Sequence, residues 1–230
     1  LWPVIYGRSL SCQVKCAAGD RQGAMGVYAE ILKLQPGLAG AYFEDEIESC
    51  LAYTRTRLGF RDEAEAWLDE TPPAEIGAER ARAAERLLLR AKIELILDRP
   101  SQSFADLTRL TDLAERWGAV LWQIEALALQ AVSWHKDGEP GRALAALQQA
   151  LRLGEEENFV RLFLDHGAPM LELLRQAHSR GIACAYCTRL LEAAAQEVIA
   201  QPLTRQPLIA PLSKRELELL ALISAGRANK

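Results

Sequence analysis

Apolar residues recur along the 230-residue chain at the three- and four-residue spacing of amphipathic helices, and turn residues interrupt them at a regular interval. The predicted turns lie 40, 39, 40 and 40 residues apart, at Gly19, Gly59, Asp98, Gly138 and His178. The amphipathic stretches before the turns are Val4–Ala17, Glu44–Leu58, Ala78–Leu97, Trp117–Lys136 and Asp165–Ala177. Those after the turns are Arg21–Leu34, Asp62–Leu68, Gln102–Arg116, Gly141–Glu156 and Ala183–Ile199. The pattern predicts five helix pairs and no strand of useful length.

A small residue follows each predicted turn by five positions: Ala24, Ala64, Ser103, Ala143 and Ala183. In the first four units a bulky residue comes four positions later: Tyr28, Leu68, Leu107 and Leu147. Two antiparallel helices joined by a short turn approach closely, so a large side chain at their crossing would force them apart. We therefore predict an all-α helix-pair solenoid of about five 40-residue repeats. The alternative is an irregular helical bundle.

The small and bulky positions in the second helix of each pair, with Pro36 closing the first unit, resemble the tetratricopeptide repeat (TPR). The resemblance implies a right-handed superhelix. Because the usual repeat has about 34 residues, the longer period implies longer helices, as in the sensor domains of large bacterial regulators.

The end of the chain, Leu212–Lys230, has the pattern of a capped helix. Ser213 is a good N-cap residue, Glu216 completes a capping box three positions later, and Gly226 can end the helix. The segment resembles the start of the LuxR-type helix-turn-helix domain through Leu212, Ser213, Arg215, Glu216, Leu220, Ile223, Gly226, Asn229 and Lys230. Ala228 departs from that family's usual Ser or Thr. The alternative is any capped amphipathic helix followed by glycine.

This second resemblance implies DNA contacts from Lys214, Arg215, Asn229 and Lys230. The second helix and the recognition helix of the LuxR-type domain have no counterpart in the sequence, so we expect a truncated start of that domain at 212–230. Before it, 201–211 contains three prolines and is expected to be a linker.

The preceding run resembles the end of the helical-repeat domain of MalT-like regulators, which are large LuxR-type transcription factors. The matching residues are Ala150, Leu151, Leu153, Glu156, Phe159, Arg161, Phe163, Asp165, Gly167, Met170, Leu174, Leu190 and Leu191. The resemblance implies that 1–200 is a TPR-like sensor domain. It also implies an ATP-binding module N-terminal to Leu1, because no Gly-Lys pair, and so no phosphate-binding P-loop, occurs in the chain. No cofactor is expected within these 230 residues.

The net charge of −4 argues against nucleic-acid binding by the chain as a whole. Five cysteines without a secretion signal, and no apolar run of membrane-spanning length, indicate a cytoplasmic protein with reduced thiols and no membrane partner. Cys184 and Cys187 form a C-x-x-C, but without a second such pair we interpret them as small apolar residues on a helix and expect no metal site.

Candidate ligand-binding residues come from the first helix of each pair. The repeat places Glu46, Glu85, Glu125 and Asp165 in one column, with Tyr6 in that position of the first unit. Along the same faces lie Tyr53, Lys92, His135, Glu172 and Arg175. Such a column can hydrogen-bond to hydroxyl groups or attract a cationic ligand. The alternative is a row of solvated acids near helix starts, which the helix dipole favours. Trp117, Trp122 and Trp134 form either a stacking surface or core.

No catalytic set is recognisable, and we do not expect an enzyme. The sequence has no nucleophile elbow and no H-E-x-x-H, and adjacent residues such as Asp165 and His166 point apart on a helix. The resemblance implies a sensor that binds a small molecule or a regulatory protein and controls a DNA-binding domain, with RNA polymerase as a further partner. The alternative is a TPR-type protein-interaction scaffold unrelated to transcription.

Overall fold

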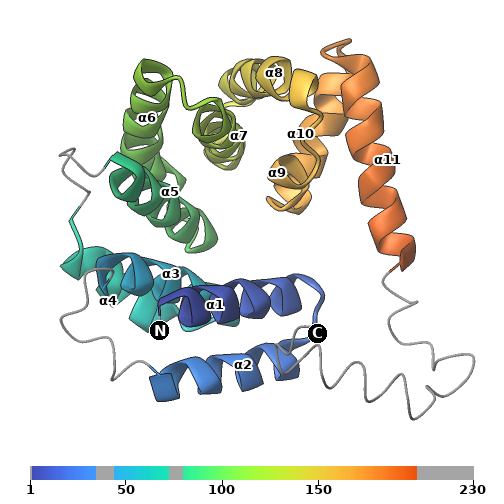
Figure 1. Ribbon diagram of the computed structural model, residues 1–230. Helices are drawn as coiled ribbons and strands as arrows, with labels where there is room; N and C mark the ends of the chain where they lie inside the picture. The colour runs from blue at the N-terminus through green and yellow to red at the C-terminus, as the bar shows by residue number, and fades with distance from the viewer. Residues whose placement is uncertain (1, 35–43, 73–79, 201–230) are drawn as a thin grey trace, which may run out of the picture. The chain divides into compact units, whose positions relative to one another are not determined.

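The computed structural model describes residues 2–34, 44–72 and 80–200, and within these ranges every regular element is a helix (Figure 1). The helices are α1 (Trp2–Ala17), α2 (Arg21–Leu34), α3 (Glu44–Leu58), α4 (Arg61–Glu70), α5 (Arg80–Ile96), α6 (Pro100–Trp117), α7 (Val120–Lys136), α8 (Pro140–Glu157), α9 (Arg161–Leu164), α10 (Ala168–Ser179) and α11 (Cys184–Ala200). None of these helices combines the length and the apolar character needed to cross a bilayer.

The chain divides into two units, Leu1–Glu192 and Ala193–Lys230. The first unit holds α1 to α10 and the start of α11. Within it the helices of the first four pairs pack on each other, α1 on α2, α3 on α4, α5 on α6 and α7 on α8. The first helices also contact one another in the series α1–α3, α3–α5, α5–α7 and α7–α10. The predicted all-α helical-repeat fold is confirmed. The predicted linker and DNA-binding segment, with Lys214, Arg215, Asn229 and Lys230, lie outside the described residues.

The first four predicted turns are confirmed. Gly19, Gly59, Asp98 and Gly138 all have positive φ, between 64° and 90°. The next residue in each turn donates its backbone N–H to the carbonyl five positions earlier, as in the bond of 2.9 Å from Asp20 to Lys15. A hydrogen bond of this kind ends a helix when the residue before the donor adopts the left-handed conformation. The same turn therefore sets the geometry of the first four helix pairs.

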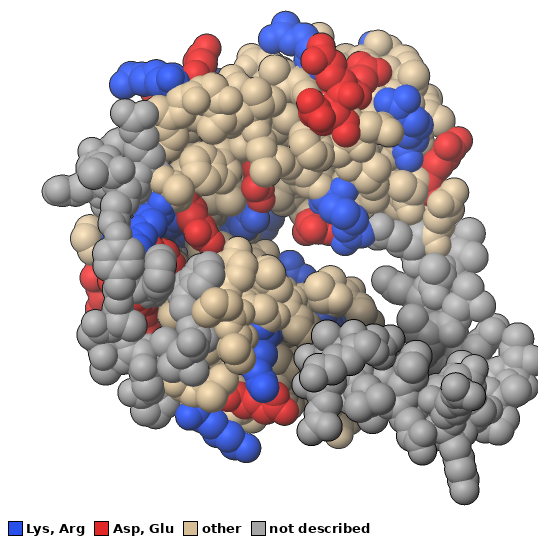
Figure 2. Space-filling view, in the orientation of Figure 1, with Lys and Arg blue, Asp and Glu red and all other residues tan. Residues whose placement is uncertain are grey.

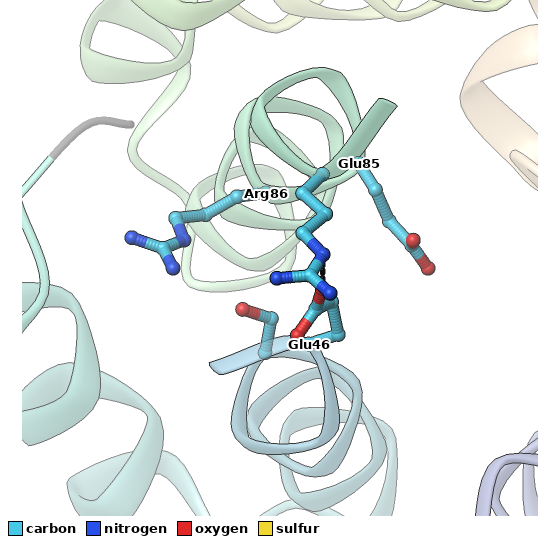
Figure 3. A pocket seen from close by; sticks show the side chains of 5 residues that line it. Glu46, Glu85 and Arg86 are labelled. Atoms are coloured by element: carbon cyan, nitrogen blue, oxygen red, sulfur yellow. Dashed lines mark ion pairs between the residues drawn. The ribbon is translucent and has the colours of Figure 1, made fainter. Parts of the chain in front are cut away.

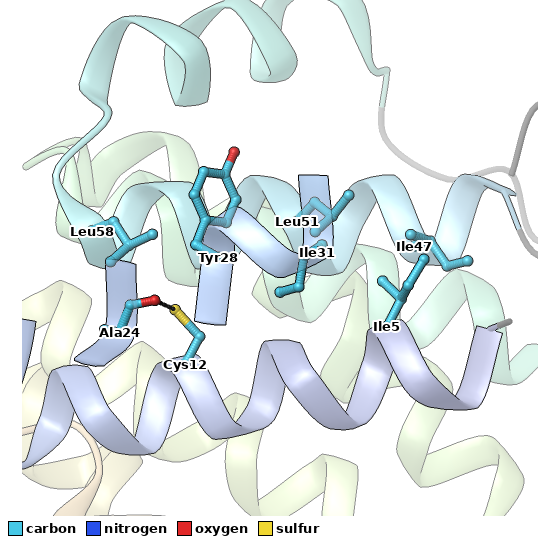
Figure 4. Close-up of a cluster of buried hydrophobic side chains, with 8 residues drawn as sticks. All are labelled: Ile5, Cys12, Ala24, Tyr28, Ile31, Ile47, Leu51 and Leu58. Carbon is cyan, nitrogen blue, oxygen red and sulfur yellow. Dashed lines mark hydrogen bonds between the residues drawn. The ribbon is translucent and has the colours of Figure 1, made fainter. Parts of the chain in front are cut away.

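The small residues after these turns lie where the two helices of a pair cross. Ala24, Ala64, Ser103 and Ala143 are fully buried, and each is the fourth residue of its helix. Figure 4 shows the first crossing, where Cys12 of α1 donates its thiol to the carbonyl of Ala24 at 3.3 Å. Around it, Ile5, Tyr28, Ile31, Ile47, Leu51 and Leu58 form a core shared by α1, α2 and α3.

The fifth pair departs from the prediction. His178 is the penultimate residue of α10, and the positive φ values fall at Gly181 and Ala183, so the turn comes later than predicted. Ala183 consequently lies in the turn and not at the helix crossing. Cys187, the fourth residue of α11, is fully buried at the corresponding position.

Two further boundaries differ because glycine ends or begins a helix. Trp117 ends α6 and does not begin α7, since Gly118 adopts the left-handed conformation at the C-cap. Gly167 precedes α10 with a φ of 71°, so Asp165 belongs to the connection between α9 and α10 and not to a first helix. The short helix α9 was not predicted.

Candidate ligand-binding site

Side chains from successive first helices meet around Lys92. The Nζ atom of Lys92 on α5 lies 2.5 Å from Oε1 of Glu125 on α7, and 5.8 Å from the ring centre of Tyr53 on α3. The Lys92 and Glu125 side chains are only 20% and 19% exposed. Burial acts to lower the pKa of Lys92, but the Glu125 carboxylate, with smaller contributions from Tyr53 and Asp165, raises the pKa above its usual value. The ammonium group therefore stays charged.

His166 extends this group from the connection between α9 and α10. Its Nε2 atom is buried and has no hydrogen-bond partner among the described residues. Burial, with a smaller contribution from the Lys92 charge, lowers the pKa of the imidazole to about 4, although Glu125 acts in the opposite direction. At neutral pH His166 is uncharged and has one donor and one acceptor nitrogen. We call Tyr53, Glu85, Lys92, Glu125 and His166 the Lys92 cluster.

A small pocket lies next to the cluster, between α3 and α5 (Figure 3). Its lining residues are Glu46, Ser49, Arg82, Glu85 and Arg86, and its empty volume is about 190 Å³, part of it open to solvent. Sites for drug-sized ligands measure roughly 300–1,000 Å³. Because the 190 Å³ includes open solvent, the enclosed space is smaller still and does not hold a whole metabolite.

Most charges at the pocket are paired. Arg82 forms an ion pair with Glu46, and Arg86 lies 2.8 Å from Asp45. Glu85 forms no ion pair with any described residue. Burial raises the pKa of Glu85, as does the neighbouring Glu46 carboxylate, while Lys92 acts to lower it. The pocket thus contains one partly desolvated carboxylate without a cationic partner.

The predicted column is only partly continuous. Glu46, Glu85 and Glu125 lie on α3, α5 and α7, and the charge of Glu85 helps burial to raise the pKa of Tyr6 on α1. Asp165 is exposed and pairs with Arg161. Figure 2 shows that the surface of the first unit is hollowed on the face in view, with charged side chains of both signs bordering the hollow.

His135 and Glu172 form a separate pair. Nε2 of His135 on α7 lies 3.4 Å from a carboxylate oxygen of Glu172 on α10. Because the Glu172 side chain is 58% exposed, this contact contributes little to stability.

Of the eight predicted ligand-binding residues, the structure joins Tyr53, Glu85, Lys92 and Glu125 in the Lys92 cluster and places Glu46 in the adjoining pocket.

The tryptophans fall into two settings. The rings of Trp117 and Trp122 meet edge-on, with centres 6.2 Å apart, at the turn from α6 to α7. Trp134 on α7 packs on Phe104 of α6 and lies under Arg142 of α8. Trp134 is half-buried, so it covers the edge of the core between these helices and is not a fully buried core residue.

Cys187 is a packing residue. It is fully buried, and burial, with a smaller contribution from the exposed Cys184, raises its pKa to about 11, so the thiol stays protonated. This agrees with the interpretation of both cysteines as small residues on a helix.

Sequence reasoning missed two groups. The sequence led us to consider His166 only as a partner for Asp165. The one indication in the sequence that it belongs to the Lys92 cluster is its place next to Asp165, a residue of the predicted column. Arg90 on α5 binds Asp106 on α6 at 3.0 Å and donates to the carbonyl oxygen of Leu68 at 3.2 Å. Arg90 is 8% exposed, so this group holds two repeats together and presents no surface to a ligand.

A family comparison places these features in context. The model of the MalT-like TPR region matches residues 4–180, which is most of the chain and includes every residue of the Lys92 cluster. The chain belongs to the MalT-like TPR region family. The comparison with curated proteins gave no match.

Proposed function

We propose that this chain is the effector-sensing domain of a LuxR-type, MalT-like transcriptional regulator. In this role it binds a small molecule or a regulatory protein and controls a C-terminal DNA-binding domain. The observation that carries the proposal is the Lys92 cluster, in which α3, α5, α7 and the α9–α10 connection bring charged and polar groups together within a MalT-like TPR region.

The position of the cluster suggests how binding would be transmitted. Tyr53, Lys92 and Glu125 belong to three successive helix pairs, so a ligand that contacts all three fixes the spacing between neighbouring pairs. A ligand that binds better to one spacing than to another shifts the population toward it. Because each repeat packs on the next, such a shift can propagate along the array.

The proposal assigns DNA contacts to Lys214, Arg215, Asn229 and Lys230, which match the LuxR-type pattern. It further assigns ATP binding to a module N-terminal to Leu1, RNA polymerase as a partner, a cytoplasmic location and no catalytic activity. These assignments rest on the resemblance alone.

A protein-interaction scaffold is the second candidate. It is favoured by exposed apolar side chains at the turn from α6 to α7, where Val120 and Leu121 are 44% and 50% exposed beside Trp117 and Trp122. Exposed apolar groups gathered in one place often mark a protein-binding surface.

Transcript profiling separates the two candidates. The gene is deleted in the source organism and restored as wild type, as Glu125→Gln or as the control Glu115→Gln, whose side chain is exposed on α6. A regulator predicts a set of transcripts that changes on deletion, returns with wild type and Glu115→Gln, and is misregulated with Glu125→Gln. An unchanged transcript profile on deletion, with a protein partner retained by the chain, would favour the scaffold.

A further inference from the structure

The chemistry of the pocket at Glu85 indicates what kind of ligand the site takes, an inference that rests on the proposed sensing function. The charged groups around the pocket are four carboxylates and three cations: Asp45, Glu46, Glu85, Glu125, Arg82, Arg86 and Lys92. Each cation is already paired with a carboxylate, by the contacts Arg82–Glu46, Arg86–Asp45 and Lys92–Glu125. Glu85 is the carboxylate left over.

An unpaired, partly buried carboxylate is costly. It has lost part of its hydration without gaining a cationic partner, and Glu46 beside it adds repulsion. A cation entering the pocket would remove this cost and form a charge-assisted hydrogen bond, whereas an anion would add to the repulsion. A neutral hydroxyl group would leave the charge uncompensated.

The surroundings of Lys92 indicate that a ligand bound at Glu85 extends toward Lys92. Nε2 of His166 is buried without a hydrogen-bond partner among the described residues, although buried polar atoms are nearly always paired. The Lys92 charge acts on the pKa of both Glu85 and His166, so these two groups lie on the same part of the surface as Lys92. The ring of Tyr53, which faces the Lys92 ammonium, adds an aromatic wall.

We infer that this site binds a small organic cation, whose ammonium or guanidinium group pairs with Glu85 in the pocket and whose polar remainder reaches His166. The pocket is partly open to solvent, so such a head group can approach Glu85 while the rest of the molecule lies over the Lys92 cluster. The acidic column therefore selects its ligand through a single uncompensated charge and not through four equivalent acids.

Isothermal titration of the 230-residue chain at low salt tests this inference, with agmatine and putrescine as cationic probes, glucose as the neutral probe and succinate as the anionic probe. We expect at least one cationic probe to bind, and Glu85→Gln to weaken its binding about tenfold or more, the effect of losing one charge-assisted hydrogen bond. Glu85→Asp, which keeps the charge on a shorter side chain, should retain part of the affinity. The matched control Glu115→Gln should bind like wild type.

Thermal unfolding of each variant checks that it is folded. The inference is overturned if neither cation binds, or if Glu85→Gln binds them as tightly as wild type, which would show only general attraction to an acidic surface. Binding of glucose or succinate through Lys92 would also overturn it while leaving the sensing function intact. Conversely, cation binding through Glu85 with no transcript change on gene deletion would support the site and contradict the sensing function.

Discussion

The ammonium of Lys92 on α5 lies 2.5 Å from the carboxylate of Glu125 on α7, and this pair joins two successive repeats through their first helices. Both side chains are about four-fifths buried, so each charge depends on the other for compensation. The pair is the centre of the Lys92 cluster: the Tyr53 ring lies near the ammonium, and both charges act on the pKa of His166.

Replacing Lys92 with Met should destabilise the chain by about 1–3 kcal/mol, because it leaves Glu125 partly buried without its cation. The double variant Lys92→Met/Glu125→Leu should recover part of this loss, since an apolar pair removes the uncompensated charge. Urea denaturation of the two single variants and the double variant gives the coupling energy. Additive effects of the two substitutions would show that the pair does not couple the repeats.

His166, whose Nε2 atom is buried, should make stability depend on pH below neutrality. Its folded-state pKa of about 4 lies below the usual value of 6.5, so between these values the unfolded chain binds more protons than the folded one. Stability contributed by neutral His166 is therefore present above pH 6.5 and is lost as the pH falls toward 4. The variant His166→Gln cannot take up this proton, so its free energy of unfolding should fall less between pH 7 and pH 5 than that of wild type.

Urea denaturation at the two pH values measures this difference. His178→Gln, which removes an exposed histidine from the end of α10, is the matched control and should follow wild type. Parallel pH dependence of wild type and His166→Gln would contradict the neutral state of the His166 imidazole.

Gly154 on α8 leaves room for the aromatic pair that closes the last repeat. A Cβ atom at this position would lie 3.0 Å from the Phe163 ring and 3.2 Å from the Tyr186 hydroxyl. These rings pack edge to face, and the Tyr186 hydroxyl donates to the carbonyl oxygen of Phe159 at 2.5 Å, so neither can move freely. Gly154→Ala should lower stability by about 1–3 kcal/mol through overpacking.

The same helix offers a control for helix propensity. Gly141 in the first turn of α8 has no neighbour within 4 Å of a built Cβ, so Gly141→Ala should be neutral or stabilising by up to about 1 kcal/mol. Thermal unfolding compares the two. Gly154→Ala with a midpoint at or above that of wild type would show that the aromatic pair yields to the added methyl group.

The repeat could be predicted from the sequence because one local device recurs. The left-handed residue at Gly19, Gly59, Asp98 and Gly138 and the small residue five positions later both follow from the close crossing of two helices. The prediction for the fifth unit was wrong because its turn is longer. The chain reverses direction through Gly181 and Ala183, so the small residue buried early in the second helix is Cys187. Residue spacing alone does not reveal a change in turn length.

The candidate site was harder to predict. The period of 40 residues placed Glu46, Glu85 and Glu125 on successive first helices, but pairing depends on side-chain direction. Arg82 forms an ion pair with Glu46, and Lys92 forms one with Glu125, whereas Glu85 forms no ion pair with a described residue. The spacing of the three acids in the sequence does not reveal this difference. His166 escaped prediction because the short helix α9 and Gly167 displace the start of α10.

A repeated contact did carry a readable signal. Arg21, the first residue of α2, donates to the carbonyl oxygen of Leu58 at 2.8 Å, and Arg61, the first residue of α4, donates to that of Leu97 at 3.2 Å. The two arginines stand 40 residues apart, and each caps the end of the next repeat's first helix. The third unit has Pro100 at this position, which begins a helix equally well but cannot make the contact.

The receptor role of the Lys92 cluster is tested most directly by a thermal-shift screen of the 230-residue chain against metabolites of its source organism, repeated with Glu125→Gln and with the control Glu115→Gln. At a hundredfold excess over the dissociation constant a ligand adds about 2.7 kcal/mol, which corresponds to roughly 5–10 °C for a domain of this size. We predict that at least one compound raises the midpoint of wild type and Glu115→Gln by this amount but not that of Glu125→Gln. If every stabilising compound raises the midpoint of Glu125→Gln equally, the cluster is not the receptor site.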